Sequence, residues 1–146
     1  MRKKRIMIIG PSRSGKTTLA NRLNEYEGPL RRTQDVIYGK KTIDIPSSYI
    51  ENAGMYKHII SISQDASHVL LLVDSSKQHQ VYSPGFAKSF QCPVIGVITK
   101  MDLMLENEDL SLKELKATGV GETYYRISAL KGIGMEALKE YLFSTE

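Results

Sequence analysis

A glycine-rich segment near the N-terminus has the residue types and the spacing of a phosphate-binding loop. It fits the pattern G-x-x-x-x-G-K-[ST] and reads Gly10-Pro11-Ser12-Arg13-Ser14-Gly15-Lys16-Thr17, with Thr18 directly after it. The two glycines allow the backbone to curl, so that successive N–H groups converge on a phosphate anion. Lys16 is then expected to reach the terminal phosphates, and the Thr17 hydroxyl to complete a Mg²⁺ shell. The spacing therefore predicts that residues 10–18 bind a nucleotide polyphosphate together with magnesium.

The sequence on either side of this loop supplies the elements that would position it. Arg5–Ile9 is a short run, mostly apolar and bounded by Gly-Pro, which predicts a buried strand. After the loop, Leu19, Leu23 and Tyr26 recur at helical spacing. A helix that begins at the loop directs its positive N-terminal end at the bound phosphates. Strand, loop and helix thus follow each other in the order that the phosphate site requires.

Strand and helix patterns alternate along the rest of the chain. Buried strands are predicted at 69–73, 93–98 and 123–127, and the segments 35–38 and 41–45 flank a hairpin turn at Gly39-Lys40. Such alternation is typical of a mainly parallel sheet covered by helices on both faces. We therefore predict an α/β fold with three layers, α/β/α, of the P-loop NTPase type. Its sheet should be mostly parallel and six-stranded, with one antiparallel edge strand.

Two serines carry the spacing of a capping box and predict helix starts. Ser48 precedes Glu51 by three residues, and Ser111 precedes Glu114 by three. The first of these helices has an apolar stripe of Tyr49, Ala53, Tyr56 and Ile60; the second is expected to stop at Gly119. A last helix carries the stripe Leu138, Tyr141 and Leu142. Without an internal repeat or a linker, residues 1–146 are expected to form a single domain.

Composition and charge argue against several other classes of protein. The 146 residues are 41% hydrophobic and 25% charged, which is the composition of an ordinary globular domain. No apolar run is long enough for a membrane span. The net charge is +4, but the basic residues are spread out and lack interleaved aromatics, so a nucleic-acid partner is not expected. The single cysteine, Cys92, cannot form an internal disulfide, which suits a cytoplasmic location.

Two later motifs bear on which base is bound. Thr99-Lys100-Met101-Asp102 directly follows a predicted strand and resembles the [NT]-K-x-D motif of Ras-like GTPases. The resemblance implies that Asp102 accepts hydrogen bonds from guanine N1–H and the exocyclic amine, a donor pair that adenine lacks. The Lys100 stem would pack over the base. Ser128-Ala129-Leu130 follows the last predicted strand and resembles the S-A-[KL] motif, whose alanine N–H contacts guanine O6. Together the two motifs favour guanine over adenine.

The residues expected around the metal and the γ-phosphate lie between these motifs. Asp44 ends a predicted strand and occupies the place of the aspartate in D-x-x-G, where it would hold Mg²⁺ through a water molecule. Thr33 is the candidate switch threonine; Thr42 is a poorer candidate, because it lies inside a strand. Ser47 stands where the motif has glycine, and Ser48 is not the glutamine that orients water in Ras. Serine keeps the N–H but narrows the accessible φ/ψ, so we expect binding with slow hydrolysis.

Across most of its length the sequence resembles the EutP/PduV family of small Ras-like GTPases. Besides the phosphate loop, the shared features are Arg31-Arg32-Thr33-Gln34, the segment 43–49, Gln64-Asp65-Ala66 and residues 99–102. The family is associated with bacterial ethanolamine and propanediol utilisation and with protein-shelled microcompartments. The resemblance implies a cytoplasmic bacterial protein, with a microcompartment shell or operon-encoded protein as partner, and Thr33 as the switch threonine. Ile45 and Ser47 depart from the family pattern I-D-T-P-G-E-Y, so binding is carried over better than turnover.

Three hypotheses about function remain open at this point. The first is a magnesium-dependent guanine-nucleotide switch with slow GTPase activity, in which Lys16, Thr33 and Ser47 serve catalysis. The second is a P-loop phosphotransferase that uses ATP, since acetate kinase activity has been attributed to members of the family. The third is a nucleotide-stabilised scaffold that does not hydrolyse, motivated by Ser47. The sequence does not distinguish ethanolamine from propanediol utilisation.

Overall fold

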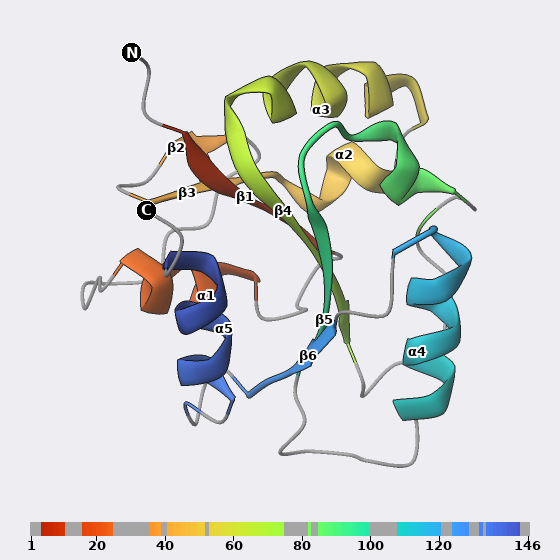
Figure 1. Cartoon of the computed structure of the whole chain (residues 1–146). Coiled ribbons are helices and arrows are strands. Elements are labelled where there is room, and N and C mark those ends of the chain that lie inside the picture. The colour runs from red at the N-terminus through yellow and green to blue at the C-terminus, as the bar shows by residue number, and fades with distance from the viewer. Residues whose placement is uncertain are drawn as a thin grey trace.

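The structure, a computed structural model, describes residues 4–10, 16–24, 36–38, 41–51, 53–74, 82, 85–99, 108–120, 124–128, 132 and 134–143. Strands and helices alternate along the chain (Figure 1). In order they are β1 (Arg5–Ile9), α1 (Lys16–Asn24), β2 (Ile37–Tyr38), β3 (Thr42–Asp44), α2 (Ser47–Glu51), the 3-10 helix η1 (Ala53–Met55), α3 (Tyr56–Ile62), the 3-10 helix η2 (Ser63–Asp65), β4 (Ala66–Asp74), the 3-10 helix η3 (Phe86–Ser89), β5 (Val94–Thr99), α4 (Glu108–Ala117), β6 (Tyr124–Arg126) and α5 (Met135–Phe143).

The strands form one six-stranded sheet in the order β2-β3-β1-β4-β5-β6. β1 lies between β3 and β4 and is parallel to both, and β4, β5 and β6 continue in parallel. β2 pairs antiparallel with β3, Ile37 opposite Asp44 and Tyr38 opposite Ile43. The turn predicted at Gly39-Lys40 lies outside the described residues. Because five strands run the same way, their carboxyl ends meet at one edge of the sheet.

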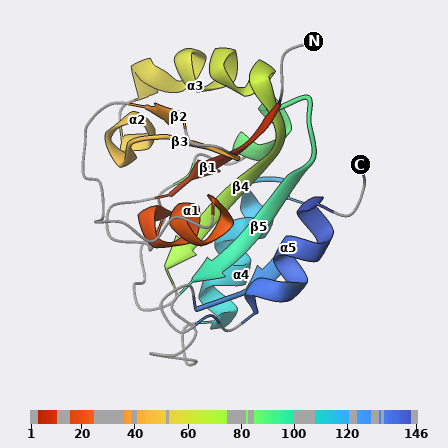
Figure 2. The same cartoon turned by 90° about the vertical axis from the view of Figure 1, so that its left-hand side faces the viewer.

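Helices cover both faces of the sheet, which confirms the predicted three-layer class (Figures 1 and 2). In β1 the side chains alternate: Ile6 and Ile8 enter the cluster beneath α1 and α5, whereas Met7 and Ile9 enter the cluster on the opposite face. All four are at most 2% exposed. This burial on both faces explains why the central strands are almost uninterrupted apolar runs. Leu138 of the predicted α5 stripe is fully buried on the α1 side.

Two predicted helix starts are wrong. α2 begins at Ser47, so Ser48 lies in its first turn and not before it; the chain then passes through η1 into the separate helix α3. The single helix expected from the stripe of Tyr49, Ala53, Tyr56 and Ile60 is therefore divided. α4 begins at Glu108, three residues before the predicted start at Ser111. The Ser-x-x-Glu spacing thus places both helix starts too late in the sequence.

The C-terminal end of α4 agrees with its prediction. The helix ends at Ala117, and Gly119 has a φ of +94°, a value that side-chain-bearing residues rarely adopt. A Cβ at this position would also lie 2.8 Å from the Lys88 side chain. Gly119 thus turns the chain out of α4 toward β6.

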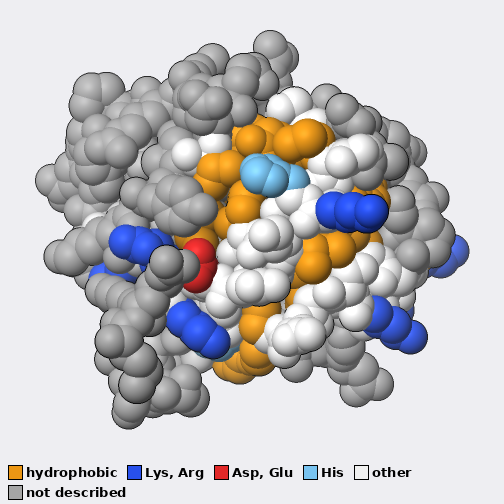
Figure 3. Space-filling view, turned by 90° about the horizontal axis from the view of Figure 1, so that it is seen from above, with side chains coloured by type: hydrophobic (Ala, Val, Ile, Leu, Met, Phe, Trp, Pro, Cys, Tyr) orange, Lys and Arg blue, Asp and Glu red, His pale blue; other side chains and the backbone are white. Residues whose placement is uncertain are grey.

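Two observations describe the surface of the residues that the structure covers. Among these residues no helix combines the length and the apolar character needed to cross a membrane. On the face seen in Figure 3, the Lys and Arg side chains that the structure describes stand apart and form no continuous stripe. They are mixed there with apolar and neutral polar side chains.

Candidate nucleotide site

Several of the predicted site residues lie at the carboxyl edge of the sheet. Gly10 follows β1 and is buried, Asp44 is the last residue of β3, and Thr99 is the last of β5. Ser128 lies just beyond β6. In Figure 2 the arrowheads of β4 and β5 mark the carboxyl end of the sheet. Ligands of open α/β sheets bind outside the carboxyl ends of the strands, so this edge is where the site is expected.

Lys16 and Asp44 interact electrostatically at this edge. Lys16 is the first residue of α1 and is half-buried. Burial lowers the pKa of its amine from the ordinary value of 10.5, and the carboxylate of Asp44 acts in the opposite direction by stabilising the charged form. Removal of water is the larger of the two influences on this pKa. A partly desolvated ammonium group interacts more strongly with a nearby anion than it would in water.

Backbone and side-chain bonds both fix the position of Asp44. Its Cα pairs with that of Ile8 in the β1–β3 ladder. The next residue, Ile45, donates its N–H to the carbonyl of Ile8 at 3.1 Å. The Thr42 hydroxyl lies 3.2 Å from Asp44 Oδ1 and donates to it. Because residues two apart on a strand share a face, Thr42 and Asp44 both point to the side of the sheet that α1 covers.

The donor atoms at this edge fit a magnesium ion. Within the described residues there is no group of three or more His, Cys, Asp or Glu side chains able to hold a metal. Asp44 supplies a carboxylate at the end of β3. Mg²⁺ is typically bound through one or two carboxylates, with phosphate and water oxygens supplying the rest. Asp44 would hold the ion from the protein side, together with the Thr17 hydroxyl that the sequence motif assigns to it.

Ser47, the residue in place of the motif glycine, is the first residue of α2 and half-buried. The N–H of Tyr49 donates to the carbonyl of Pro46 at 3.0 Å and closes the first turn. The backbone at Ser47 is therefore part of a helical turn. Glycine at a helix start would raise the conformational freedom of this segment.

The other end of the edge is built from buried neutral hydroxyl residues. Thr99 is 2% exposed, and its Oγ1 donates to the carbonyl of Val73 on the neighbouring strand at 3.3 Å. Ser128 is 1% exposed. The N–H of Ile127 donates to the carbonyl of Ile98 at 2.9 Å and so holds the chain just before Ser128 against β5. These contacts fix the ends of β5 and β6, from which the two base motifs continue.

The other predicted site residues are described only in part or not at all. Thr17 and Thr18 lie in the first turn of α1, and Thr18 is half-buried. The remaining ones lie outside the described residues: Pro11, Ser12, Arg13, Ser14, Gly15, Thr33, Lys100, Asp102, Ala129 and Leu130. Their roles in binding or catalysis stay predictions.

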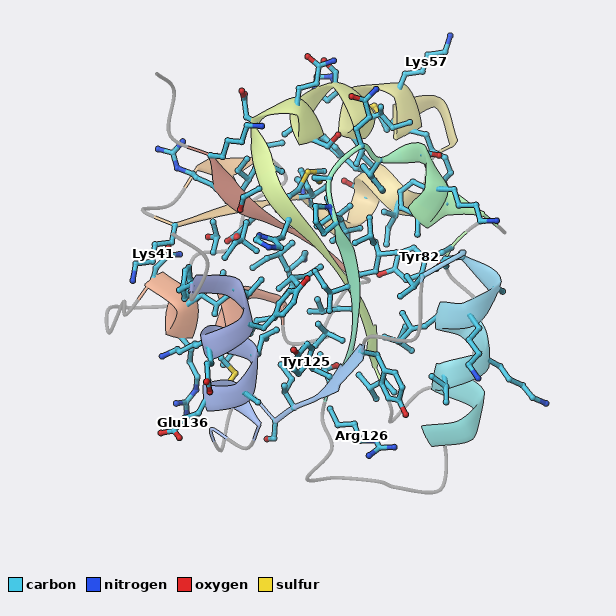
Figure 4. The ribbon with its side chains drawn as sticks, viewed as in Figure 1. Lys41, Lys57, Tyr82, Tyr125, Arg126 and Glu136 are labelled. Atoms are coloured by element: carbon cyan, nitrogen blue, oxygen red, sulfur yellow. The ribbon has the colours of Figure 1, made fainter. Side chains whose placement is uncertain are left out.

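Two features near the edge were not anticipated from the sequence. Asn24, at the end of α1, donates to Thr42 Oγ1, and through it contacts the β3 end of the site. Tyr82 is 3% exposed, and its hydroxyl lies 2.6 Å from the carbonyl of Leu72 and 3.2 Å from that of Ile9, the residue before Gly10 (Figure 4). Its ring stacks on Phe86 at 5.9 Å. From the sequence, Thr42 was only the poorer candidate for the switch threonine, and its bonds to Asn24 and Asp44 were not predicted.

Comparison with solved structures defines the class to which this arrangement belongs. The chain resembles translation elongation factor SelB from Methanococcus maripaludis, solved in complex with the GTP analogue GppNHp, with a TM-score of 0.71. The match covers 99% of this chain but 34% of that one, so it corresponds to one part of a longer protein. At 23% identity this likeness establishes the fold alone. The fold is that of the P-loop GTPases, with the motif loop between β1 and α1.

Sequence comparison then identifies the family. Residues 3–144 match PduV-EutP, the family described as ethanolamine utilisation and propanediol utilisation, and the chain belongs to this family. Propanediol utilization protein PduV of Citrobacter freundii is 32% identical over 98% of this chain and 95% of its own length. A protein of Escherichia coli (strain K12) named "Probable acetate kinase EutP" is 29% identical over 97% and 90%. The family recognised from the sequence motifs is thereby confirmed.

Proposed function

We propose that this chain is a magnesium-dependent guanine-nucleotide-binding protein with slow GTP hydrolysis, acting as a switch in ethanolamine or propanediol utilisation. The observation that carries the proposal is geometric: Lys16 of the loop sequence 10–17 begins α1, directly after β1 and its loop, and Asp44 ends β3, the strand beside β1, so both lie at the carboxyl edge. Membership of the family and the SelB-like fold give further support. One domain over residues 1–146 in the bacterial cytoplasm is part of the same proposal.

The phosphate-binding role follows from charge and position. Lys16 presents a half-buried cation at the start of α1, where the helix N-terminus also favours an anion. Asp44, at the end of the neighbouring strand β3, stabilises the charged form of Lys16 and would anchor the metal side of a metal–polyphosphate complex. Bound magnesium bridges phosphate oxygens and neutralises their charge. Thr17 and Thr33 would add hydroxyl oxygens at the same place.

Selection of guanine is assigned to the motifs that continue from β5 and β6. Thr99 is held by the carbonyl of Val73, so the strand end from which Lys100–Asp102 extends has a fixed position. Asp102 would accept two hydrogen bonds from guanine, and the N–H of Ala129 would donate to its O6. Ser128 is buried and directly precedes Ala129 in the sequence, which supports the assignment of Ala129 to the base site.

Slow turnover is proposed because Ser47 occupies the first turn of α2. The residue at this position has to bring its N–H to the γ-phosphate when GTP is bound. A helical serine reaches other backbone conformations less readily than glycine. Ser48, two positions into the helix, supplies no glutamine amide to orient water. We therefore expect the chain to bind GTP and to hydrolyse it slowly.

The test is calorimetric titration of the nucleotide-free chain with GDP, GTPγS, ADP and ATPγS, each with and without Mg²⁺. Binding of the guanine nucleotides alone, strengthened by Mg²⁺, is the expected result. Preference for the adenine nucleotides would overturn the proposal. A single-turnover assay with GTP then measures hydrolysis; fast cleavage without a partner would contradict the slow switch, and no cleavage at all would favour the non-hydrolysing scaffold.

Phosphoryl transfer from ATP to acetate is the second candidate, favoured by the name of the E. coli relative. In that reaction an acetate oxygen attacks the γ-phosphorus, the bond to ADP breaks, and acetyl phosphate forms. Trapping acetyl phosphate with hydroxylamine gives a coloured hydroxamate that can be measured directly. Production of hydroxamate that depends on acetate and ATP, and disappears in Lys16→Ala, would establish this function in place of the GTPase.

A protein partner completes the proposal. Family membership in the utilisation systems makes a microcompartment shell protein, or another product of the same operon, the expected class. Binding of purified shell and operon proteins should differ between the GDP-bound and GTPγS-bound chain. Equal binding in both states would argue against a switch.

A further inference from the structure

We infer that Asn24 and Thr42 are positioning residues that hold the Asp44 carboxylate in place for the metal. The inference rests on the proposed function and extends it to two side chains outside the recognised motifs. Its basis is a chain of hydrogen bonds that begins at the end of α1, crosses to β3 and ends at the carboxylate next to Lys16.

The Asn24 amide, at the start of this series of hydrogen bonds, makes three hydrogen bonds. Its Nδ2 donates one hydrogen bond to the carbonyl of Ala20 at 2.8 Å and one to Thr42 Oγ1 at 2.9 Å. Its Oδ1 accepts from the N–H of Lys41 at 2.6 Å. An amide group has two donor protons, and here both are used. The hydrogen bond that Oδ1 accepts from Lys41 and the one that Nδ2 donates to Ala20 together fix the orientation of the Asn24 amide.

The donor-to-acceptor order of these hydrogen bonds follows from the number of protons that each group can donate. Thr42 is 0% exposed, and its hydroxyl has one proton. Since Asn24 Nδ2 already donates to Thr42 Oγ1, that proton is available for Asp44 Oδ1, 3.2 Å away. The polar groups are thus ordered amide to hydroxyl to carboxylate. A buried hydroxyl that loses one partner would be costly, which resists rotation of any of the three groups.

This series of hydrogen bonds ends at Asp44, the carboxylate that would hold the metal in the proposed function. Thr42 contacts Asp44 from its own strand, while the charge of Lys16 acts on the same carboxylate from α1. Groups that hydrogen-bond a carboxylate near a metal set its direction, and their loss typically weakens metal affinity by about 10- to 100-fold. At 3.2 Å the bond from Thr42 is longer than the usual hydroxyl–carboxylate distance, which favours the lower end of this range.

Thr42→Val tests the inference, because it removes the hydroxyl and keeps the branched shape. The Mg²⁺ affinity of the complex with fluorescent mant-GDP should fall about 10-fold, in line with other groups that orient a metal-binding carboxylate. Affinity for mant-GDP in EDTA should change by less than about twofold, because Lys16 and the loop remain. Thr42→Ser should restore most of the Mg²⁺ affinity. A matched control is Thr118→Val, which removes an equally buried hydroxyl that donates to the carbonyl of Leu115, outside the chain of bonds.

Asn24→Asp is a second variant with almost the same shape. Its carboxylate would accept the Thr42 proton and so draw it away from Asp44. The added negative charge would by itself attract Mg²⁺, so weaker Mg²⁺ binding in this variant can be attributed to the lost orientation. Thermal unfolding without ligand identifies any loss that comes from the fold alone.

Two different failures can be told apart. If the wild-type chain binds no guanine nucleotide, the proposed function is overturned and this inference with it. If the wild type binds normally while Thr42→Val and Thr118→Val have the same Mg²⁺ affinity, only the positioning role is overturned. Equal losses of Mg²⁺ and nucleotide affinity in Thr42→Val would likewise assign Thr42 to general packing.

Discussion

The phosphate half and the base half of the carboxyl edge differ in charge and in the partners of their polar side chains. The phosphate half, defined by Lys16, Asp44, Thr42 and Asn24, contains two opposite charges and joins its polar side chains to one another. The described residues of the base half, Thr99 and Ser128, are neutral hydroxyl residues that are almost completely buried, and the charged residues Lys100 and Asp102 of the motif lie outside the described residues. There the Thr99 hydroxyl bonds to the backbone of the neighbouring strand. Among the described residues, the phosphate half thus orients charged side chains, whereas the base half holds the backbone at the strand ends in place.

The difference follows from what each half is proposed to bind. Charged groups taken out of water need opposite charges and hydrogen bonds nearby, so a phosphate and metal site requires a local network. A planar base is recognised by a few directed hydrogen bonds, which depend on accurate placement of loop residues. The base half therefore contributes fixed strand ends, and discrimination falls to the residues that follow them. Variants in each half should have different consequences.

Lys16→Ala should have the largest effect, on affinity for every nucleotide. The lost contact is a hydrogen bond between charged groups, worth about 1.5–3 kcal/mol, so affinity should fall roughly 10- to 100-fold. Calorimetry with GDP and GTPγS measures the loss. Lys57→Ala is the control, since Lys57 is exposed on α3 and extends away from the protein (Figure 4). Equal behaviour of the two variants would contradict the phosphate role of Lys16.

Asp102→Asn should alter selectivity and leave the phosphate half intact. An amide can accept from N1–H but cannot accept from the exocyclic amine of guanine. GDP affinity should fall by about 10-fold or more, since one buried bond is replaced by two facing donors. Xanthosine diphosphate, which has a carbonyl in place of that amine, should gain affinity. Competition between the two nucleotides measures the change, and an unaltered preference for GDP would remove Asp102 from the base site.

Ser47→Gly should change turnover more than binding. Glycine widens the conformations open to this position at a cost of about 0.5–1 kcal/mol in helix stability. We expect single-turnover GTP hydrolysis to rise several-fold, with GDP affinity unchanged. Ser61→Gly, at an exposed position in α3, controls for general loosening of a helix. A rate equal to that of the wild type would mean that another feature limits hydrolysis.

Thr99→Val should have the smallest effect on binding. Its hydroxyl donates to Val73, so its loss should lower the free energy of unfolding by about 1 kcal/mol. Because this contact is internal to the sheet, GDP affinity should fall less than about threefold. Urea denaturation and calorimetry on the same variant separate the two quantities. A large loss of GDP affinity at normal stability would show that the Thr99 hydroxyl contacts the nucleotide itself.

The fold could be predicted largely from its central strands. β1, β4 and β5 are buried on both faces, so their sequences are short apolar runs that stand out from the rest. The limits of the helices were harder to predict. Gly54 lies at the division between α2 and α3 and disfavours a continuous helix, but the apolar stripe from Tyr49 to Ile60 continues across it and led to the prediction of one helix. Tertiary packing against η3 includes Tyr56 on Phe86, ring centroids 4.9 Å apart, which the local sequence does not reveal.

The candidate site divides in the same way. Lys16, Asp44 and Thr99 could be placed at one edge, because motif spacing and strand direction determine where strand ends lie. Asn24 and Thr42 could not, because their bond joins residues 18 positions apart on different elements. Tyr82 and Ile9 are 73 positions apart. Such contacts depend on how the elements pack, and no spacing rule within one segment contains that information.

Tyr82 has a consequence for the order of folding. Its hydroxyl reaches the carbonyls of Ile9 and Leu72, which belong to adjacent strands, so both contacts can form only after β1 and β4 have paired. An interaction made after the main barrier slows unfolding without speeding folding. Tyr82→Phe should therefore accelerate unfolding and leave the folding rate nearly unchanged, a φ-value near zero in stopped-flow experiments. The Tyr82 hydroxyl, next to the start of the phosphate loop, would then slow the separation of β1 and β4 during unfolding without affecting how fast they pair.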